Sequence, residues 1–170
     1  NLIREYPNSP YEVDSKFELA KSYLSEGRLD EAMTYYNDIK NNYPSNPYAK
    51  LSLRDICLIY VKKSDTPNVK SSWVEMKTKY RNDPVVCDTY TICKDVLIED
   101  AEFQQDAMII CGASKNEVES DVFSKAEIAA QDGDCTNAIN KLNDYLTKFQ
   151  PASHKTEAHQ YLAQCYLKLG

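Results

Sequence analysis

Glycine is scarce in this sequence: only four of its 170 residues are glycine. The loops that cradle nucleotide phosphates, G-x-x-x-x-G-K-S/T and G-x-G-x-x-G, need glycines at close spacing, and neither loop occurs. The G-x-S-x-G turn of α/β-hydrolases is missing as well. Strand-like alternation of apolar and polar residues is also hard to find. These absences exclude the common nucleotide-binding and hydrolase motifs and favour a helical chain.

Histidine is rare too, and the two present are His154 and His159. Five residues of helix separate them by about 140° around its axis, so one metal ion could not easily bind both. No pair of cysteines has the C-x-x-C spacing of structural zinc sites. We therefore expect no metal, no cofactor and no catalytic residues. The alternative is an enzyme whose carboxylates, histidines and cysteines are brought into one deep pocket from distant segments.

The six cysteines are expected to be small, buried apolar side chains inside helices. Disulfides remain the alternative, because an even number of cysteines permits pairing in an oxidising compartment. The residues concerned are Cys57, Cys87, Cys93, Cys111, Cys135 and Cys165.

Long apolar runs are missing, since none approaches the roughly 20 residues needed to span a bilayer, so we expect no direct membrane insertion. Charge is uneven. Residues 1–84 carry 13 Lys/Arg and 12 Asp/Glu, whereas residues 85–170 carry 7 and 14. An acidic second half argues against nucleic acid as a partner. We interpret its carboxylates, Glu119 among them, as a solvated surface, with an acidic docking patch as the alternative.

A repeated segment is the main positive signal. Residues 6–11 (YPNSPY) return as residues 43–48 (YPSNPY) and in weaker form at 80–84 (YRNDP), with a spacing of 37 residues both times. A fixed period in this range is typical of stacked supersecondary units rather than one closed globule. Such an array acts mainly through its surface, so the functional question becomes which partner it binds.

Turn residues between the repeats predict where helices begin and end. Ser9, Asn46, Thr66 and Asp83 each precede a proline, a pairing typical of an N-cap followed by the first helical position. Ser9 with Glu12, and Ser114 with Glu117, have the spacing of capping boxes. Gly27 and Gly133 are expected to end helices in the left-handed conformation. The predicted helices are 1–6, 11–26, 29–43, 48–63, 67–81, 85–98, 102–111, 117–131, 135–149 and 154–169.

The first full unit resembles the tetratricopeptide repeat. The residues that carry the resemblance are Leu19, Ala20, Tyr23, Gly27, Ala32, Tyr36 and Pro44. The period of 37 exceeds the family's usual 34, and Lys16 stands where the family has tryptophan. The resemblance implies an all-α fold, an α-α superhelix (solenoid) of stacked antiparallel helix pairs with about ten helices.

On this register, residues 1–170 form a single solenoid segment. Its units are about 11–47, 48–84, a degenerate 85–116, 117–153 and a partial 154–170. Because the first residues already have a helical pattern, we expect a segment of a longer array. Open arrays also expose their terminal helices, so end-to-end self-association is expected through apolar residues there. These are Leu2, Ile3, Tyr6, Tyr161, Leu162, Tyr166, Leu167 and Leu169.

The amino-acid sequence of the turns is similar to that of repeats in bacterial cell-envelope proteins, such as the Tol-Pal coordinator, the outer-membrane assembly lipoproteins and long arrays of Bacteroidota. This similarity favours the periplasm or cell envelope, with the cytoplasm as the alternative.

The family resemblance implies that the first helix of each pair lines a concave face that binds proteins or peptides. A partner with apolar anchors and some acidic character would suit the first two units. A purely architectural spacer is the alternative. The residues expected on the concave face are Asp14, Phe17, Lys21, Leu24, Leu51, Arg54, Leu58, Lys62, Phe123 and Glu127.

Overall fold

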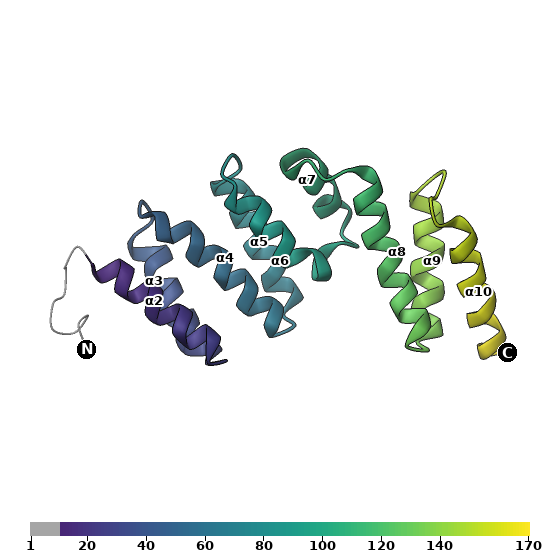
Figure 1. Ribbon diagram of the computed structural model, residues 1–170, viewed down its shortest axis with the longest axis horizontal. Helices are drawn as coiled ribbons and strands as arrows, with labels where there is room; N and C mark the ends of the chain where they lie inside the picture. Colours follow the sequence, from purple (N-terminus) through teal and green to yellow (C-terminus); the bar gives the residue numbers. More distant parts are fainter. Residues whose placement is uncertain (1–10) are drawn as a thin grey trace. The chain divides into compact units, whose positions relative to one another are not determined.

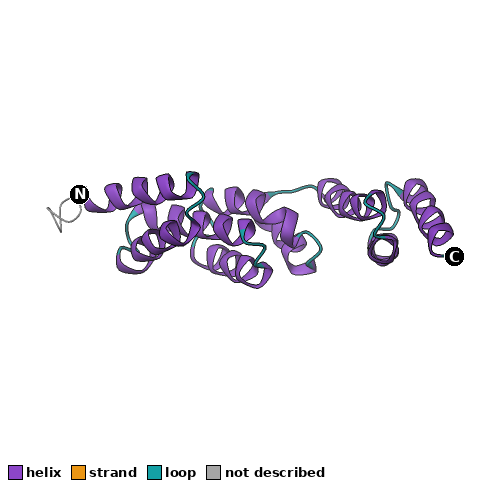
Figure 2. Cartoon of the chain, turned by 90° about the horizontal axis from the view of Figure 1, so that it is seen from below, coloured by secondary structure: helices purple, strands orange, loops and turns teal. Residues whose placement is uncertain are grey.

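The computed structural model describes residues 11–170, and within them the chain forms nine α-helices and no strand (Figure 1). Figure 2 shows the same helices joined by loops. The all-helical prediction is therefore confirmed, while the predicted helix over residues 1–6 and the Ser9 cap lie outside the described residues. The helices are α2 (Glu12–Ser25), α3 (Leu29–Asn42), α4 (Pro47–Lys62), α5 (Thr66–Lys79), α6 (Val85–Leu97), α7 (Ala101–Cys111), α8 (Lys115–Gln131), α9 (Cys135–Lys148) and α10 (Lys155–Leu169).

Side-chain caps explain where several of these helices begin. The Asn46 side chain accepts a hydrogen bond from the backbone N–H of Tyr48 at 2.9 Å, with Pro47 as the first helical residue of α4. The predicted capping box of α8 is confirmed, because the Glu117 N–H donates to Ser114 Oγ at 3.1 Å and the Ser114 N–H donates to the Glu117 carboxylate at 2.6 Å.

One predicted cap is wrong. Thr66 is the first residue of α5, and Asp65 is its N-cap, accepting from the Asn68 N–H at 3.3 Å. A carboxylate also interacts more favourably with the positive end of the helix than a hydroxyl does. At the other helix ends, Gly27 has φ of 77° and Gly133 has φ of 82°, which confirms the two predicted left-handed glycines.

Backbone contacts divide the described chain into two units, with the boundary in the sequence between Leu97 and Ile98. Each unit is described by itself. Unit 1 contains α2 to α6, and unit 2 contains α7 to α10. Within unit 1 each helix packs on the next, and α4 also contacts α2 and α6. Within unit 2, α8 packs on α9, α9 packs on α10, and α8 also contacts α10. Packing between chain neighbours is typical of helical repeats; a single continuous solenoid stays a prediction.

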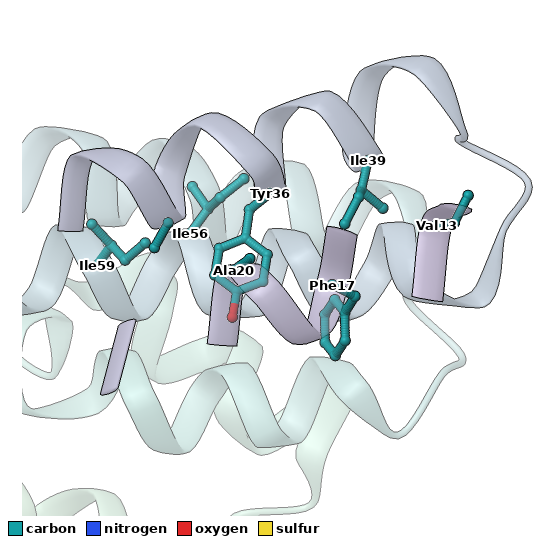
Figure 3. Packing of buried hydrophobic residues seen from close by; sticks show 8 residues of the cluster. Val13, Phe17, Ala20, Tyr36, Ile39, Ile56 and Ile59 are labelled. Carbon is teal, nitrogen blue, oxygen red and sulfur yellow. The ribbon is translucent and has the colours of Figure 1, made fainter. Parts of the chain in front are cut away.

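The core of unit 1 lies between α2, α3 and α4, where large side chains gather around small ones (Figure 3). Ala20 and Ala32 are completely buried, which lets α2 and α3 approach closely. The Phe17 ring meets Tyr36 edge-on at 5.7 Å between centroids and stacks on Tyr48 at 4.5 Å. This packing of large side chains beside small ones positions α4 against the α2–α3 pair.

Unit 2 repeats this packing 106 residues later. Ala126 and Ala138 are completely buried at the positions equivalent to Ala20 and Ala32. Phe123 contacts Tyr145 at 5.3 Å and stacks on His154 at 4.5 Å. The two buried alanines and the ring stack across 31 residues have the same spacing in both units, which indicates that α8 and α9 form a helix pair of the same kind as α2 and α3.

The cysteines follow two patterns. Four are buried free thiols, as expected of small apolar core residues: Cys57, Cys93, Cys135 and Cys165. For the other two the expectation of a free buried thiol is wrong, because the sulfur of Cys87 and the sulfur of Cys111 each belong to a disulfide.

Candidate functional site

The candidate site is a surface of unit 1 made by the first helices of its pairs. The backbones of α2 and α4 contact each other, as do those of α4 and α6. The second helices α3 and α5 are joined by an ion pair between Lys40 and Glu75 at 3.2 Å. We call the accessible part of this surface the first-helix face. It comprises Asp14, Lys21, Leu24, Leu51, Arg54, Leu58 and Lys62.

Three leucines make this face partly apolar. Leu24 and Leu51 are half-buried and rest on the core of unit 1, and Leu58 is half-buried on the same helix as Leu51. Leu51 and Leu58 are seven residues apart, so they lie on one side of α4, two turns from each other. Their outer surfaces are available to a partner, whereas their inner surfaces are held by packing.

Arg54 is less available than its charge suggests. Its guanidinium donates to the Asp55 carboxylate at 2.8 Å from Nε and 2.7 Å from Nη2, and Asp55 is only 4% exposed. Tyr36 Oη lies buried nearby without a hydrogen bond, and burial together with the Asp55 charge raises the pKa of this phenol above its usual range. The orientation of the Arg54 guanidinium is therefore fixed, and the buried Asp55 carboxylate neutralises part of its charge.

The other charged side chains of the first-helix face are exposed to solvent. Lys21 and Glu18 form an exposed pair at 3.1 Å, and such pairs contribute little to stability. Lys62 and Asp14 are exposed as well. These groups can exchange their water or their present partner for a ligand at small cost.

Two predicted site residues lie beneath the surface. Phe17 is 4% exposed and stacks on Tyr48 at the start of α4, and Phe123 is 5% exposed and stacks on His154 just before α10. Glu127, in unit 2, is half-buried and accepts a hydrogen bond from Tyr161 Oη at 2.7 Å. The rings position their neighbours, and the Glu127 carboxylate links α8 to α10.

A polar cluster around Lys16 was not foreseen. Its ammonium lies 2.6 Å from Glu12 and 2.7 Å from Asp38, and it also donates to Tyr43 Oη at 3.3 Å. Burial alone would lower the pKa of Lys16, but the hydrogen bonds to Asp38, Glu12 and Tyr43 outweigh it and raise the pKa above its usual range. The i, i+4 spacing of Glu12 and Lys16 was the available signal. The cluster fastens α3 to α2.

The interpretation of Glu119 as a solvated carboxylate is wrong. This side chain is only 2% exposed, and it accepts hydrogen bonds from Tyr145 Oη at 2.8 Å and from the Ser153 N–H at 2.5 Å. Ser153 Oγ adds a third bond at 3.2 Å. Burial raises the pKa of Glu119, but these donors lower it by more, so the net pKa lies below its usual range. Burial and the Glu119 charge raise the pKa of Tyr145 to about 12.

Neither cluster resembles a metal centre. Among residues 11–170, no group of three or more His, Cys, Asp or Glu side chains could hold a metal ion. Every helix in the same range is too short or too polar to span a lipid bilayer.

Comparison with known families bears on the first helix pair. Residues 14–46 match the family model of the tetratricopeptide repeat. The matched segment covers nearly all of α2, all of α3 and the turn that follows. A search of curated proteins found no significant match. Together, the match and the pairwise helix packing support a protein built on tetratricopeptide repeats.

Proposed function

We propose that this chain is a non-catalytic protein-interaction scaffold whose first-helix face binds a peptide or helix of a partner protein. The observation that carries the proposal is the row of half-buried leucines, Leu24, Leu51 and Leu58, flanked by the cations Lys21, Arg54 and Lys62. Apolar anchors surrounded by polar groups are the usual composition of a protein-binding surface. Tetratricopeptide repeats are generally interaction modules, which supports the same function.

The chemistry of the face favours a partner with apolar side chains and carboxylates. Leucine surfaces offer contact area without hydrogen-bond requirements, so they accept aliphatic or aromatic anchors. Lys21 and Lys62 are exposed cations on the same two helices as these leucines, which favours acidic residues beside the anchors.

The cell envelope is the compartment we propose, with the periplasm favoured over the cytoplasm. The similarity of the turns to bacterial envelope repeats supports this. The disulfide sulfurs of Cys87 and Cys111 support it as well, because disulfides persist in oxidising compartments.

A spacer function is the second candidate, and one observation favours it. Several charges on or near the face already have partners inside unit 1, including Arg54 with Asp55 and Lys21 with Glu18. If all the charges of the face are already paired within unit 1, the segment would only separate flanking modules.

Site-specific photo-crosslinking in native cells separates the two functions. A photoreactive residue at Leu58 reports on the first-helix face, and one at Thr34, exposed on α3, is the matched control. We expect a discrete adduct with one protein from Leu58 and none from Thr34. The adduct should disappear when Lys21 and Lys62 are both changed to glutamate. The absence of an adduct from Leu58, or equal adducts from both positions, would support the spacer. A Leu58 adduct that survives the charge reversal would contradict the role given to Lys21 and Lys62.

A further inference from the structure

We propose that Cys135 and Cys165 are a reversible redox pair, which forms a disulfide between α9 and α10 in an oxidising environment. Both residues belong to unit 2, and neither lies on the first-helix face. The structure contains the pair in its reduced form, as two free thiols. The redox pair can therefore fail without the proposed function, and the proposed function can fail without the redox pair.

The two cysteines share one small core cluster. Cys135 is 3% exposed and Cys165 is 1% exposed, and both pack with Ala129, Ala130 and Ala138. Alanine side chains are short, so they allow the helices that carry the cysteines to approach closely. Burial, and then a hydrogen bond with the Cys135 thiol, raise the pKa of Cys165. The α9–α10 contact thus brings two sulfur atoms together inside an apolar core.

The repeat register shows what stands at this contact in unit 1. With the spacing of 106 residues, Cys135 takes the place of Leu29, and Cys165 takes the place of Ile59. Ile59 is completely buried in the core of unit 1, and Leu29 packs against the same cluster. Two aliphatic residues are sufficient there, so packing alone requires sulfur at neither position. Cysteine at both positions together is what a disulfide needs.

The surroundings of the pair favour a disulfide over a bound metal ion. Metal ions bind thiolates rather than thiols, and burial in an apolar core disfavours the charged thiolate. Two sulfurs are also fewer than the four ligands of a structural zinc site. A disulfide is neutral, so it can replace the two thiols in the core without leaving an uncompensated charge.

Unit 1 contains a second pair of neighbouring thiols, to which the proposal does not extend. Cys57 and Cys93 lie in the interiors of α4 and α6 and are completely buried. A hydrogen bond with Cys57, together with burial, raises the pKa of Cys93 above its usual range. Cys135, by contrast, is the first residue of α9 and directly follows the turn at Gly133, and helix ends open at low cost. An oxidant therefore reaches Cys135 more easily than it reaches Cys57 or Cys93.

The reaction balances as an exchange with a disulfide oxidant such as oxidised glutathione. The Cys135 thiolate attacks one sulfur of the oxidant, breaks its S–S bond and releases one glutathione thiolate. The Cys165 thiolate then attacks the Cys135 sulfur of the mixed disulfide and releases the second glutathione. The two cysteines lose two electrons and two protons, and the oxidant becomes two molecules of glutathione thiol. In a cell, another disulfide-carrying oxidant of an oxidising compartment would take the place of glutathione.

The disulfide would fasten α10 to α9. The two cysteines are 30 residues apart, and a crosslink over such a loop stabilises the fold mainly by restricting the unfolded chain. We expect it to raise the midpoint of thermal unfolding by about 5–10 °C. Unit 2 would then be more resistant to unfolding under oxidising conditions than under reducing ones.

Peptide mapping tests the pairing. The full chain is reduced, folded without oxidant, and then incubated with oxidised glutathione. Remaining thiols are alkylated in denaturant, and the chain is digested with trypsin without reduction. Trypsin cuts after lysine and arginine, so the digest should contain residues 126–141 linked to residues 156–168.

The same digest contains an internal comparison. Cys57 and Cys93 should be recovered in alkylated form, because the folded chain protects them. Recovery of Cys135 and Cys165 in alkylated form, or a bond from Cys165 to a different cysteine, would overturn the proposal. Oxidation of Cys57 and Cys93 in a chain whose Cys135 and Cys165 stay reduced would overturn it as well.

Thermal unfolding separates the disulfide from packing. The difference in midpoint between the oxidised and reduced forms is measured for each chain, so the cost of a smaller side chain cancels. This difference should be about 5–10 °C smaller for Cys135→Ala than for the natural chain. Cys57→Ala, the matched control in the other pair, should keep the natural difference. A difference that survives Cys135→Ala, or that Cys57→Ala reduces equally, would overturn the proposal, and Cys165→Ala replaces Cys135→Ala if that variant does not fold.

Discussion

Phe123 stacks on His154 with ring centroids 4.5 Å apart and 8° between the planes, and Phe17 stacks on Tyr48 at the same 4.5 Å with 27°. Each pair spans 31 residues of sequence. In each case a first-helix phenylalanine holds the ring that begins or precedes the next first helix. The contact therefore transmits the position of one helix pair to the following helix, which is what an accurately placed surface requires.

We expect Phe17→Ala and Phe123→Ala each to destabilise the protein by about 3–5 kcal/mol, the usual cost of removing a buried aromatic ring. Denaturant unfolding followed by far-UV circular dichroism measures this loss. Val74→Ala, at a side chain that is 41% exposed, is the control and should change stability little. A loss below about 1 kcal/mol for both phenylalanines would contradict the role given to the stacks.

The buried alanines supply a second prediction. Ala126→Leu should destabilise unit 2 by about 1–3 kcal/mol or more, because α8 and α9 touch there and have no space for a larger side chain. Ala163→Leu is the matched control, since Ala163 has the equivalent position in α10 but is exposed. Thermal unfolding should show a lower Tm only for the first variant. Equal shifts would mean that Ala163 is covered in solution.

Local signals explain why the helices could be predicted from the sequence. N-caps such as Asn46 and Ser114, and the left-handed glycines, act within one turn of the chain, so their effect is visible without tertiary structure. Thr66 was misassigned because two neighbouring residues, Thr66 and Asp65, can both cap, and only the backbone shows which one does.

The polar cluster of Glu119, Tyr145 and Ser153 in unit 2 could not be predicted from local signals. Glu119 lies in an acidic stretch, and its burial depends on donors 26 and 34 residues away, Tyr145 and Ser153. The repeat register does contain a signal for this cluster. Glu119, Tyr145 and Ser153 correspond to the apolar residues Val13, Ile39 and Pro47 in unit 1. A carboxylate, a phenol and a hydroxyl that replace three apolar residues together are expected to contact one another.

Glu119 should make stability depend on acid. Its pKa in the folded protein lies below its usual value, so its contribution is present above the unfolded pKa, about 4.3, and is lost as pH falls through the folded pKa. Glu119→Gln should cost about 1–3 kcal/mol at neutral pH and flatten the decline of stability below that pH. Denaturant unfolding from pH 3 to pH 7 checks this.

Glu157→Gln, an exposed change on α10, is the control for Glu119 and should keep the natural pH profile. If Glu119→Gln retained the same acid dependence as the natural chain, another carboxylate would have to account for it.

Variants of the ion pair between Arg54 and Asp55 test whether Arg54 serves stability or binding. Arg54→Met leaves the buried Asp55 carboxylate without its donor, so we expect a loss of about 1–3 kcal/mol in the free energy of unfolding. Adding Asp55→Asn should recover part of that loss, because an amide is cheaper to bury unpaired than a carboxylate. A double-mutant cycle in denaturant measures the coupling. Lys21→Met, at an exposed pair, should leave stability nearly unchanged, since its ammonium and Glu18 are both solvated. The coupling energy between Arg54 and Asp55 could instead be no larger than that between Lys21 and Glu18. Arg54 would then be a weakly paired cation that is available to an acidic partner.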